Sequence, residues 1–327
     1  MMSNLPAHPT QTNADAATPL VTVIIPAYKV ATFIKATLGS VLSQTVSNSE
    51  IIVINDGSPD TAELEQEIAP YTHLITYIRQ PNKGAGAARN AGLRVARGEF
   101  VAFLDGDDLW LPNFLEEQLR LVNSEGGYDL VYADAGNLVG NTLVRSTNMN
   151  ANPSDGPVTP ESLIAGKCVV ITSSVVARRC LILEVGLFDE NFPNSQDFDL
   201  WLRLAKHGAR ITYQKKVLVH RRIYEASLSG NPIKSFEGEI SVLEKTKRRD
   251  DLTEGEASAI VRTIELRRAT IEVIKGKQRL SAGEFESALT AFRNANRRLQ
   301  SWKLRLVMFS LRVAPRLLQR VQSFRAT

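Results

Sequence analysis

A nine-residue segment, FVAFLDGDD at residues 100–108, is an apolar run that ends in three carboxylates around one glycine. A continuous run of β-forming residues predicts a strand buried on both faces, and open α/β sheets bind their ligands at the carboxyl ends of such strands. Carboxylates there are hard oxygen ligands, so Asp105 and Asp107 are predicted to bind Mg²⁺ or Mn²⁺. The alternative is that these acids form a turn and cap the helix that follows Pro112.

The sequence around this segment alternates between short apolar runs and stretches with helical spacing. This alternation predicts parallel βαβ units and therefore an α/β fold, a sheet flanked by helices. Clusters of Gly, Pro, Asn and Asp close several of the apolar runs, as expected for turns. The strands are predicted at 21–26, 51–54, 74–78, 100–104, 130–133 and 169–176 and near 211 and 217, and the helices at 31–44, up to about 70, at 85–96 and at 196–206.

Charge divides the 327 residues into two parts. Residues 231–327 carry 20 Lys and Arg against 11 Asp and Glu, whereas residues 1–230 carry 19 against 24, so the basic character belongs to the C-terminal part. We predict a disordered leader at 1–19, an α/β domain at 20–230, and a basic α-helical region at 231–327. No apolar run is long enough to span a bilayer.

Cysteine content limits the kinds of site that the chain can form. Only Cys168 and Cys180 occur and no CxxC is present, which argues against a zinc site or a disulfide framework. The sequence therefore favours a reducing compartment, and we expect a cytoplasmic protein that can lie on the cytoplasmic face of the plasma membrane.

Five sequence blocks, in order, resemble the family 2 glycosyltransferases, the inverting class with the GT-A fold. The resemblance covers about residues 20–230. It implies a Rossmann-like mixed sheet flanked by helices, here followed by a C-terminal α-helical extension, and a nucleotide-sugar donor. The blocks are VIIPAY at 23–28, VINDGS at 53–58, NKG at 82–84 with ARNAG at 88–92, FLDGDD at 103–108, and GLFD at 186–189 with QDFDLWLRL at 196–204.

The resemblance also assigns the donor site. It places Asp107 on the metal and Asp105 near the ribose or the metal shell. A carboxylate accepts the imide N–H of uracil, which cytosine lacks, so Asp56 indicates a UDP-linked donor unless it only caps the next helix. Arg89 has the planar fork of donors that suits diphosphate; the alternative is a solvated helix residue. The implied nucleotide-binding set is Pro26, Tyr28, Asp56, Gly84, Arg89 and Asp105.

A second possibility for this region is a dinucleotide-binding fingerprint. The segment GAGAAR at 84–89 begins like that motif, but Arg89 replaces its third glycine. The fingerprint also belongs in the first βα turn of a chain, and this segment comes later. The sequence therefore disfavours an NAD site.

Inversion at the sugar carbon requires a base opposite the diphosphate, within reach of an acceptor hydroxyl. The matching family position is Asp197, preceded here by Gln196 where the family usually has Glu. The alternative is that Asp197 only caps its helix, paired with Asn194. Family members often have a further metal-binding histidine near the end of the domain, where Tyr224 stands here, with His220 four residues upstream.

The last 35 residues have nine basic side chains and no acid. At 100° per residue, one helix through residues 298–321 places five Arg on one face and apolar residues on the other. Such a helix can bind an anionic membrane surface. The alternative is that its apolar stripe packs on the catalytic domain or forms a homodimer. Nucleic acid is not an expected partner, because the basic tail lacks interleaved aromatic residues. The apolar residues are Leu306, Val307, Leu311, Ala314, Leu317, Leu318 and Val321.

The sequence therefore predicts an inverting, metal-dependent glycosyltransferase. It would transfer a sugar from a nucleotide donor, UDP-linked by the argument above, to a hydroxyl of a glycan or lipid-linked glycan. The alternative is a non-catalytic nucleotide-sugar-binding or scaffold protein at a membrane surface, a reading favoured by Gln196 and the unusual tail.

Overall fold

The computed structural model describes residues 18–140, 142–152, 154–224 and 231–324. The predicted leader therefore lies almost entirely outside the described residues. The nine strands are β1 Val21–Ala27, β2 Ser49–Asp56, β3 Ile75–Gln80, β4 Phe100–Phe103, β5 Leu109–Trp110, β6 Leu130–Val139, β7 Thr142–Thr147, β8 Val176–Arg178 and β9 Ile211–Arg222. The α-helices that accompany them are α1 Ala31–Leu42, α2 Thr61–Ile68, α3 Ala85–Val95, α4 Phe114–Val122, α5 Asn148–Ala151, α6 Pro160–Ile164, α7 Arg179–Glu184 and α8 Gln196–Lys206.

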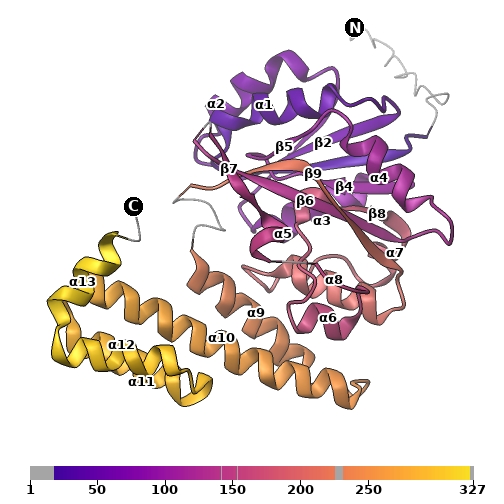
Figure 1. The fold of residues 1–327 in the computed structure, drawn as a ribbon. Coiled ribbons are helices and arrows are strands. Elements are labelled where there is room, and N and C mark those ends of the chain that lie inside the picture. Colours follow the sequence, from indigo (N-terminus) through magenta and orange to yellow (C-terminus); the bar gives the residue numbers. More distant parts are fainter. Residues whose placement is uncertain (1–17, 141, 153, 225–230, 325–327) are drawn as a thin grey trace, which may run out of the picture.

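One mixed sheet organises the first 222 residues, in the order β3-β2-β1-β4-β8-β6-β9-β5, with β7 on the side of β6 (Figure 1). The strands β3, β2, β1 and β4 are parallel, which confirms the predicted βαβ units. The sheet becomes mixed at β8, which is antiparallel to both β4 and β6. The α/β class predicted from the sequence is thus confirmed.

The predicted strand at 169–176 is wrong for most of its length. Thr172–Ser174 form a 3₁₀ turn, and only Val176 at its end belongs to a strand. Hydroxyl groups explain the difference, because Ser174 Oγ donates to Ile171 O at 2.8 Å and competes with regular strand pairing. The turn lies directly beyond β4, where it can reach the FVAFLDGDD segment.

Apolar side chains cover both faces of the sheet. On one face α1 and α4 pack through residues such as Leu38 and Phe114, and on the other α3 and α8 pack through residues such as Leu93 and Trp201. The fit of α3 is close: a Cβ on Gly92 would lie 2.7 Å from Ile24 Cγ2. The N-termini of α3 and α8 are thereby brought to the carboxyl edge of the parallel strands.

Every described residue from Pro232 to Phe324 belongs to a helix or to a short connection between helices. These helices are α9 Pro232–Thr246, α10 Glu254–Ser281, α11 Phe285–Leu299, α12 Trp302–Val313 and α13 Pro315–Phe324. A small apolar core joins them to the sheet domain, formed by Ile164 of α6, Leu202 of α8, Leu243 of α9 and Ile260 and Ile264 of α10. Figure 1 shows α9 and α10 lying against α6 and α8.

The single helix predicted over 298–321 is not formed. Helix α11 ends at Leu299, Gln300 adopts a left-handed conformation with φ 47°, and Pro315 begins a new helix. Of the predicted apolar stripe, Val307, Leu311 and Leu318 pack inward, whereas Leu306 and Leu317 are exposed. None of the described helices combines the length and hydrophobicity needed to cross a lipid bilayer.

Candidate active site

Parallel strands bring three loops to one edge of the sheet. Pro26 pairs with Ile54 in neighbouring strands, Asp56 is the last residue of β2, and Asp105 follows β4. Since parallel strands end at the same edge, residues far apart in sequence meet there. The loop after β1 is tied to the loop after β2 by the amide of Lys29, which donates to Ser58 Oγ at 2.6 Å.

Asp56 is buried and holds the loop that leads into α3. Its Oδ1 accepts hydrogen bonds from Gln80 Nε2 at 2.8 Å and from the amide of Lys83 at 2.9 Å, and its Oδ2 accepts from the amide of Gly84 at 2.8 Å. A carboxylate has about four acceptor positions, so one remains on Oδ2. Asp56 thus has a structural task as well as room for one more donor.

Glycines shape the same edge. Gly57 has φ +62°, and a Cβ there would lie 2.5 Å from the amide nitrogen of Asn82, so only glycine allows the two loops to meet. Gly84 has φ +89° at the N-terminus of α3, with no side chain in front of it. Tyr28 is 42% exposed at this edge, with its ring available to a planar ligand.

Arg89 and Asp105, both assigned to the nucleotide by the resemblance, form an ion pair with each other. The guanidinium of Arg89 is almost completely buried and packs 5.6 Å from the ring of Phe188, whereas Asp105 is 40% exposed. Only Nη2 of Arg89 reaches Asp105. Its Nε and Nη1 are buried without a hydrogen-bond partner among the described residues.

The other two acids of the segment lie deeper. Asp107 accepts a hydrogen bond from the hydroxyl of Tyr224 at 2.8 Å. Asp108 is fully buried and accepts from Ser173 Oγ at 2.6 Å and from the amide of Arg222 at 2.9 Å. Asp108 therefore ties the end of β9 and the 3₁₀ turn to the acidic segment, a structural role that the sequence analysis did not assign.

Burial and mutual repulsion raise the pKa values of these acids. Burial, followed by the charge of Asp105, raises the pKa of Asp107, although the Tyr224 hydroxyl opposes the shift. Burial, then Asp107 and Asp105, raises the pKa of Asp108 well above its ordinary value. Arg89 pairs with Asp105, whereas Asp107 forms no ion pair with a described residue and feels only the more distant charge of Arg221, so a cation bound at Asp107 would stabilise its charged form.

The acidic segment can supply two carboxylates to a divalent cation. Across the described ranges of the chain, no three His, Cys, Asp or Glu side chains are arranged to hold an ion by themselves. Asp105 and Asp107 supply two carboxylates, and Mg²⁺ is commonly held by one or two carboxylates together with substrate phosphates and water. The residues present therefore fit an ion that binds together with a diphosphate.

A cavity of about 290 Å³ opens beside these acids. Its lining includes Arg89, Asp105, the first two residues of the turn at Thr172–Ser174, and the start of α8. Four of its lining residues have buried polar atoms without a partner in the part of the chain that the structure describes. They are Arg89 Nε and Nη1, Asn148 Nδ2, Gln196 Oε1 and Trp201 Nε1.

Asp197 lies in the wall of this cavity, at the N-terminus of α8. Its Oδ2 accepts a hydrogen bond from Thr172 Oγ1 at 2.8 Å, and its Oδ1 accepts from the amide of Phe198 at 2.9 Å. Ser195, which precedes the helix, has φ 60° and makes no side-chain cap. The orientation of Asp197 is thus fixed by a threonine of the opposite loop, and no cap to Asn194 is formed.

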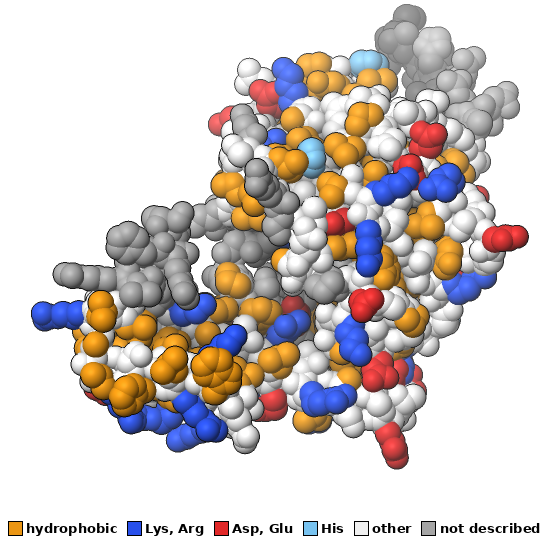
Figure 2. Space-filling view, in the orientation of Figure 1, with side chains coloured by type: hydrophobic (Ala, Val, Ile, Leu, Met, Phe, Trp, Pro, Cys, Tyr) orange, Lys and Arg blue, Asp and Glu red, His pale blue; other side chains and the backbone are white. Residues whose placement is uncertain are grey.

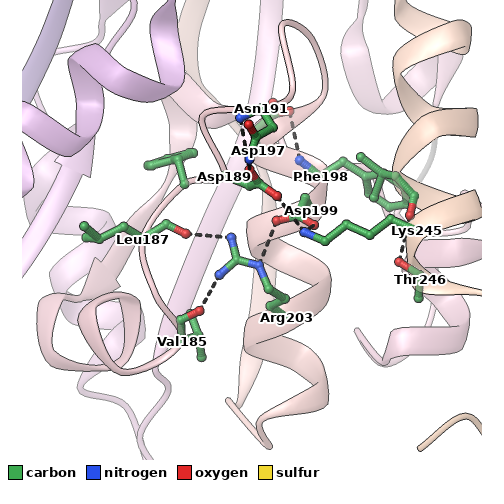
Figure 3. A network of polar contacts seen from close by, with 12 residues as sticks. Val185, Leu187, Asp189, Asn191, Asp197, Phe198, Asp199, Arg203, Lys245 and Thr246 are labelled. Carbon is green, nitrogen blue, oxygen red and sulfur yellow. Dashed lines mark hydrogen bonds and ion pairs between the residues drawn. The ribbon is translucent and has the colours of Figure 1, made fainter. Parts of the chain in front are cut away.

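A network behind Asp197 fixes the rest of the helix (Figure 3). Asp199 is buried and accepts from Arg203 Nε at 2.7 Å and from Lys245 Nζ of α9 at 2.9 Å. Arg203 also donates to the carbonyls of Val185 and Leu187. The GLFD and QDFD blocks of the sequence are therefore linked to each other and to the C-terminal helices.

The structure adds four residues that the sequence analysis did not propose for the site. Thr172 contacts Asp197, and Arg221 lines the cavity and acts electrostatically on Asp107. Glu239 and Arg267 line the cavity from α9 and α10. The basic end of β9 could have indicated Arg221; the other three had no sequence signal. His220, in β9, pairs with Leu109 of β5, and burial lowers its pKa.

Comparison with known proteins gives one family. The model described as glycosyl transferase family 2 matches residues 22–162. An uncharacterized glycosyltransferase, RT0329, from Rickettsia typhi is 30% identical over 67% of the chain and 69% of its own length. A UDP-Glc:alpha-D-GlcNAc-diphosphoundecaprenol beta-1,3-glucosyltransferase, WfaP, from Escherichia coli is 29% identical over 68% of the chain and 85% of its length.

Other curated relatives are much longer than the matched region. Three Rickettsia proteins are 30%, 34% and 31% identical to this chain in the matched region. The match covers only 37%, 30% and 37% of their respective lengths, so the chain spans about a third of each.

Two solved structures share the fold. Staphylococcus aureus TarS 1–349 in complex with UDP-GlcNAc matches 94% of this chain and 91% of its own, with TM-score 0.61 and 19% identity. The mannosyltransferase PcManGT from Pyrobaculum calidifontis, in complex with GDP-Man and Mn²⁺, matches 94% and 85%, with TM-score 0.62 and 18% identity. The sheet, the acidic segment and the sequence relatives agree: the chain belongs to glycosyltransferase family 2 and has the GT-A fold.

Proposed function

We propose that this protein is an inverting glycosyltransferase that transfers a sugar from a UDP-linked donor to a hydroxyl of a lipid-linked glycan. The observation that carries the proposal is that Arg89, Asp105 and Asp197 line one and the same cavity. The unpartnered buried atoms of Arg89, Asn148, Gln196 and Trp201 support a polar ligand there, because buried polar groups are normally hydrogen-bonded.

The donor is proposed to lie across the edge of the sheet. Tyr28 and Pro26 would contact the base, and the remaining acceptor position of Asp56 Oδ2 would take the imide N–H of uracil. Gly84 leaves the approach to α3 open. The free Nε and Nη1 of Arg89, with Arg221 nearby, would donate to the diphosphate. The TarS complex with UDP-GlcNAc, which has this fold, is consistent with a UDP donor.

Asp197 is proposed as the general base. As the acceptor oxygen forms its bond to the sugar carbon, the bond to the diphosphate breaks and Asp197 takes the hydroxyl proton. The hydrogen bonds from Thr172 and from the Phe198 amide hold the carboxylate in place and leave lone pairs for the acceptor. Gln196 cannot take a proton, so within the Gln196–Asp197 pair only Asp197 can act as the base.

The metal is proposed to be Mg²⁺ or Mn²⁺, held by Asp105 and Asp107 together with the donor diphosphate. When bound, it supplies positive charge to the leaving diphosphate. Tyr224, through its hydrogen bond to Asp107, would orient the carboxylate at the place where the family usually has a histidine. PcManGT, with the same fold, was solved with Mn²⁺.

The site of action is proposed to be the surface of an anionic membrane, with the protein on its cytoplasmic side. Trp302, Leu306, Phe309 and Val313 recur on one face of α12, and they are 57 to 68% exposed. Exposed basic side chains flank this face, and no acid occurs after Glu286, so its charge matches anionic lipid headgroups. Figure 2 shows the hydrophobic cluster with blue side chains along its edge. The basic residues are Lys303, Arg305, Arg312 and Arg316.

The test of the proposed function is the full-length Asp197→Asn variant, assayed for UDP release from a panel of UDP-sugars with Mn²⁺ and a GlcNAc-diphospho-lipid acceptor. We expect transfer to fall about 10²- to 10⁴-fold, while Mn²⁺-dependent UDP binding stays at the wild-type level. Asp250→Asn, at an exposed position outside the cavity, is the matched control. Wild-type transfer by Asp197→Asn would refute the base, and donor binding without any transfer by the wild type would favour the non-catalytic alternative.

A further inference from the structure

The wall of the cavity is completed by the C-terminal helices. Ser235 and Glu239 of α9 and Arg267 of α10 line the same space as Asp197. This arrangement is held by the apolar core between α6, α8, α9 and α10, so it does not depend on a loop. The family model ends at residue 162, and these residues lie well beyond it.

Glu239 and Arg267 form a fixed pair. Arg267 Nε donates to Glu239 Oε2 at 2.7 Å, and the two side chains are only 22% and 28% exposed. The guanidinium stacks 4.9 Å from the ring of Phe236, and the position where Gly166 would carry a Cβ is 3.2 Å from Nη2. The ring of Phe236 and the carboxylate of Glu239 therefore orient the guanidinium, and Nη1 and Nη2 have no hydrogen bond to a side chain or carbonyl of the described residues.

Helix α9 brings Glu239 to the start of α8: Ser195 Oγ donates to the carbonyl of Ser235 at 3.4 Å, and a Cβ on Gly238 would lie 2.6 Å from Ser195 Oγ. Burial raises the pKa of Glu239, Arg267 opposes the shift, and the negative charge of Asp197 adds to it. Glu239 and Asp197 therefore line the cavity from two helices that touch each other, so an acceptor bound against Asp197 lies beside Glu239.

We propose that Glu239 and Arg267 form an acceptor subsite that binds hydroxyl groups of the incoming glycan. The inference rests on the proposed function, since it names the substrate group that this wall recognises. A carboxylate beside a guanidinium accepts and donates hydrogen bonds at neighbouring positions, which matches adjacent sugar hydroxyls. A phosphate is a poorer fit, because Glu239 cancels the charge of Arg267 and would repel an anion.

The test compares acceptor KM with donor turnover. The full-length Glu239→Gln variant is assayed with GlcNAc-diphosphoundecaprenol as acceptor, and UDP release is measured with and without it. We expect acceptor KM to rise on the order of tenfold, because one charge-assisted hydrogen bond is weakened. Donor KM and acceptor-independent UDP release should not change. Glu237→Gln, exposed on the same helix and outside the cavity, is the matched control.

Arg267→Lys supplies a second measurement, since it keeps the charge and loses the planar fork. It too should raise acceptor KM without changing donor KM. If both variants lower the melting temperature and leave acceptor KM unchanged, the pair only joins α9 to α10 and the inference is wrong. If the wild type neither binds UDP with Mn²⁺ nor transfers to this acceptor, the proposed function fails first, and the subsite fails with it.

Discussion

Arg203 joins helix α8 to the segment at 185–187 through three hydrogen bonds, which makes it a direct test of how the helix that carries Asp197 is supported. Its guanidinium donates to Asp199 Oδ2 at 2.7 Å, to the carbonyl of Val185 at 2.5 Å and to the carbonyl of Leu187 at 2.6 Å (Figure 3). Replacing it by methionine keeps most of the stem and removes all three hydrogen bonds.

The expected loss of stability follows from burial. Asp199 is only 4% exposed, so it would keep a single partner, Lys245, and the two carbonyls would lose their bonds. Hydrogen bonds to charged groups contribute about 1.5 to 3 kcal/mol each, but Arg203 is 19% exposed and water would replace part of the loss. We therefore expect Arg203→Met to lower the free energy of unfolding by about 4 kcal/mol, close to the cost of breaking a buried ion pair.

The assay is thermal unfolding of the full chain followed by circular dichroism. For domains of this size, about 4 kcal/mol corresponds to roughly 8 to 16 °C in melting temperature. Arg203→Lys should fall between the wild type and Arg203→Met, because one ammonium keeps the charge but cannot replace a three-way fork. Arg262→Met, at an exposed position of α10, is the matched control. A shift for Arg203→Met no larger than that of the control would refute this account of the support.

Two further predictions concern the C-terminal helices. Replacing both Trp302 and Phe309 by serine should weaken binding to phosphatidylglycerol-rich vesicles roughly tenfold or more, because two aromatic anchors are lost; co-sedimentation measures the binding. Leu266→Ser, at another exposed apolar position, is the control. If light scattering shows a dimer that the double variant abolishes, the face serves self-association instead. Lys206 contacts Glu256 at 2.9 Å with both side chains about 90% buried. Burial raises the pKa of Glu256, but the hydrogen bonds from Lys206 and from the Thr253 amide, together with the charge of Lys206, outweigh it, and the pKa lies below the ordinary 4.5. A lowered folded-state pKa stabilises the protein above pH 4.5, so Glu256→Gln should cost about 2 kcal/mol at neutral pH, and the difference from wild type in urea unfolding should shrink as the pH falls below 4.5; a difference independent of pH would contradict the assignment.

The parallel half of the sheet could be predicted because its strands are buried on both faces. Runs such as VTVII and FVAF consist almost entirely of apolar residues, with Thr22 as the one polar position, and they form β1 and β4. The stretch at 169–176 is also largely apolar, yet hydroxyl side chains turn it at Thr172–Ser174. In the tail, the spacing of apolar residues correctly predicted helices, but the breaks at Gln300 and Pro315 divide the predicted single helix and change which apolar residues pack inward.

For the site, the sequence could predict which loop each residue occupies, but not which partner each residue binds. The motif blocks brought Asp56, Arg89 and Asp105 to one edge, because strand ends meet there in any parallel sheet. They could not indicate that Arg89 binds Asp105, or that Asp56 holds the amides of Lys83 and Gly84, since these partners depend on how the loops fold back. Glu239 and Arg267 were beyond prediction for a stronger reason: they reach the cavity only through packing between helices far along the chain.

Helix α10 connects the proposed acceptor subsite with the proposed membrane face. Arg267 lies in its middle and lines the cavity, whereas Gly276, about 14 Å further along at 1.5 Å per residue, packs against Phe292 of α11. A Cβ on Gly276 would lie 2.6 Å from that ring, so α10 and α11 meet without room to slide. Helix α12 packs in turn on this pair through Leu311. The exposed apolar face and the cavity wall thus belong to one rigid helical unit. An acceptor whose lipid stays in the membrane could then present its glycan to Glu239 and Arg267 at a distance that these helices fix.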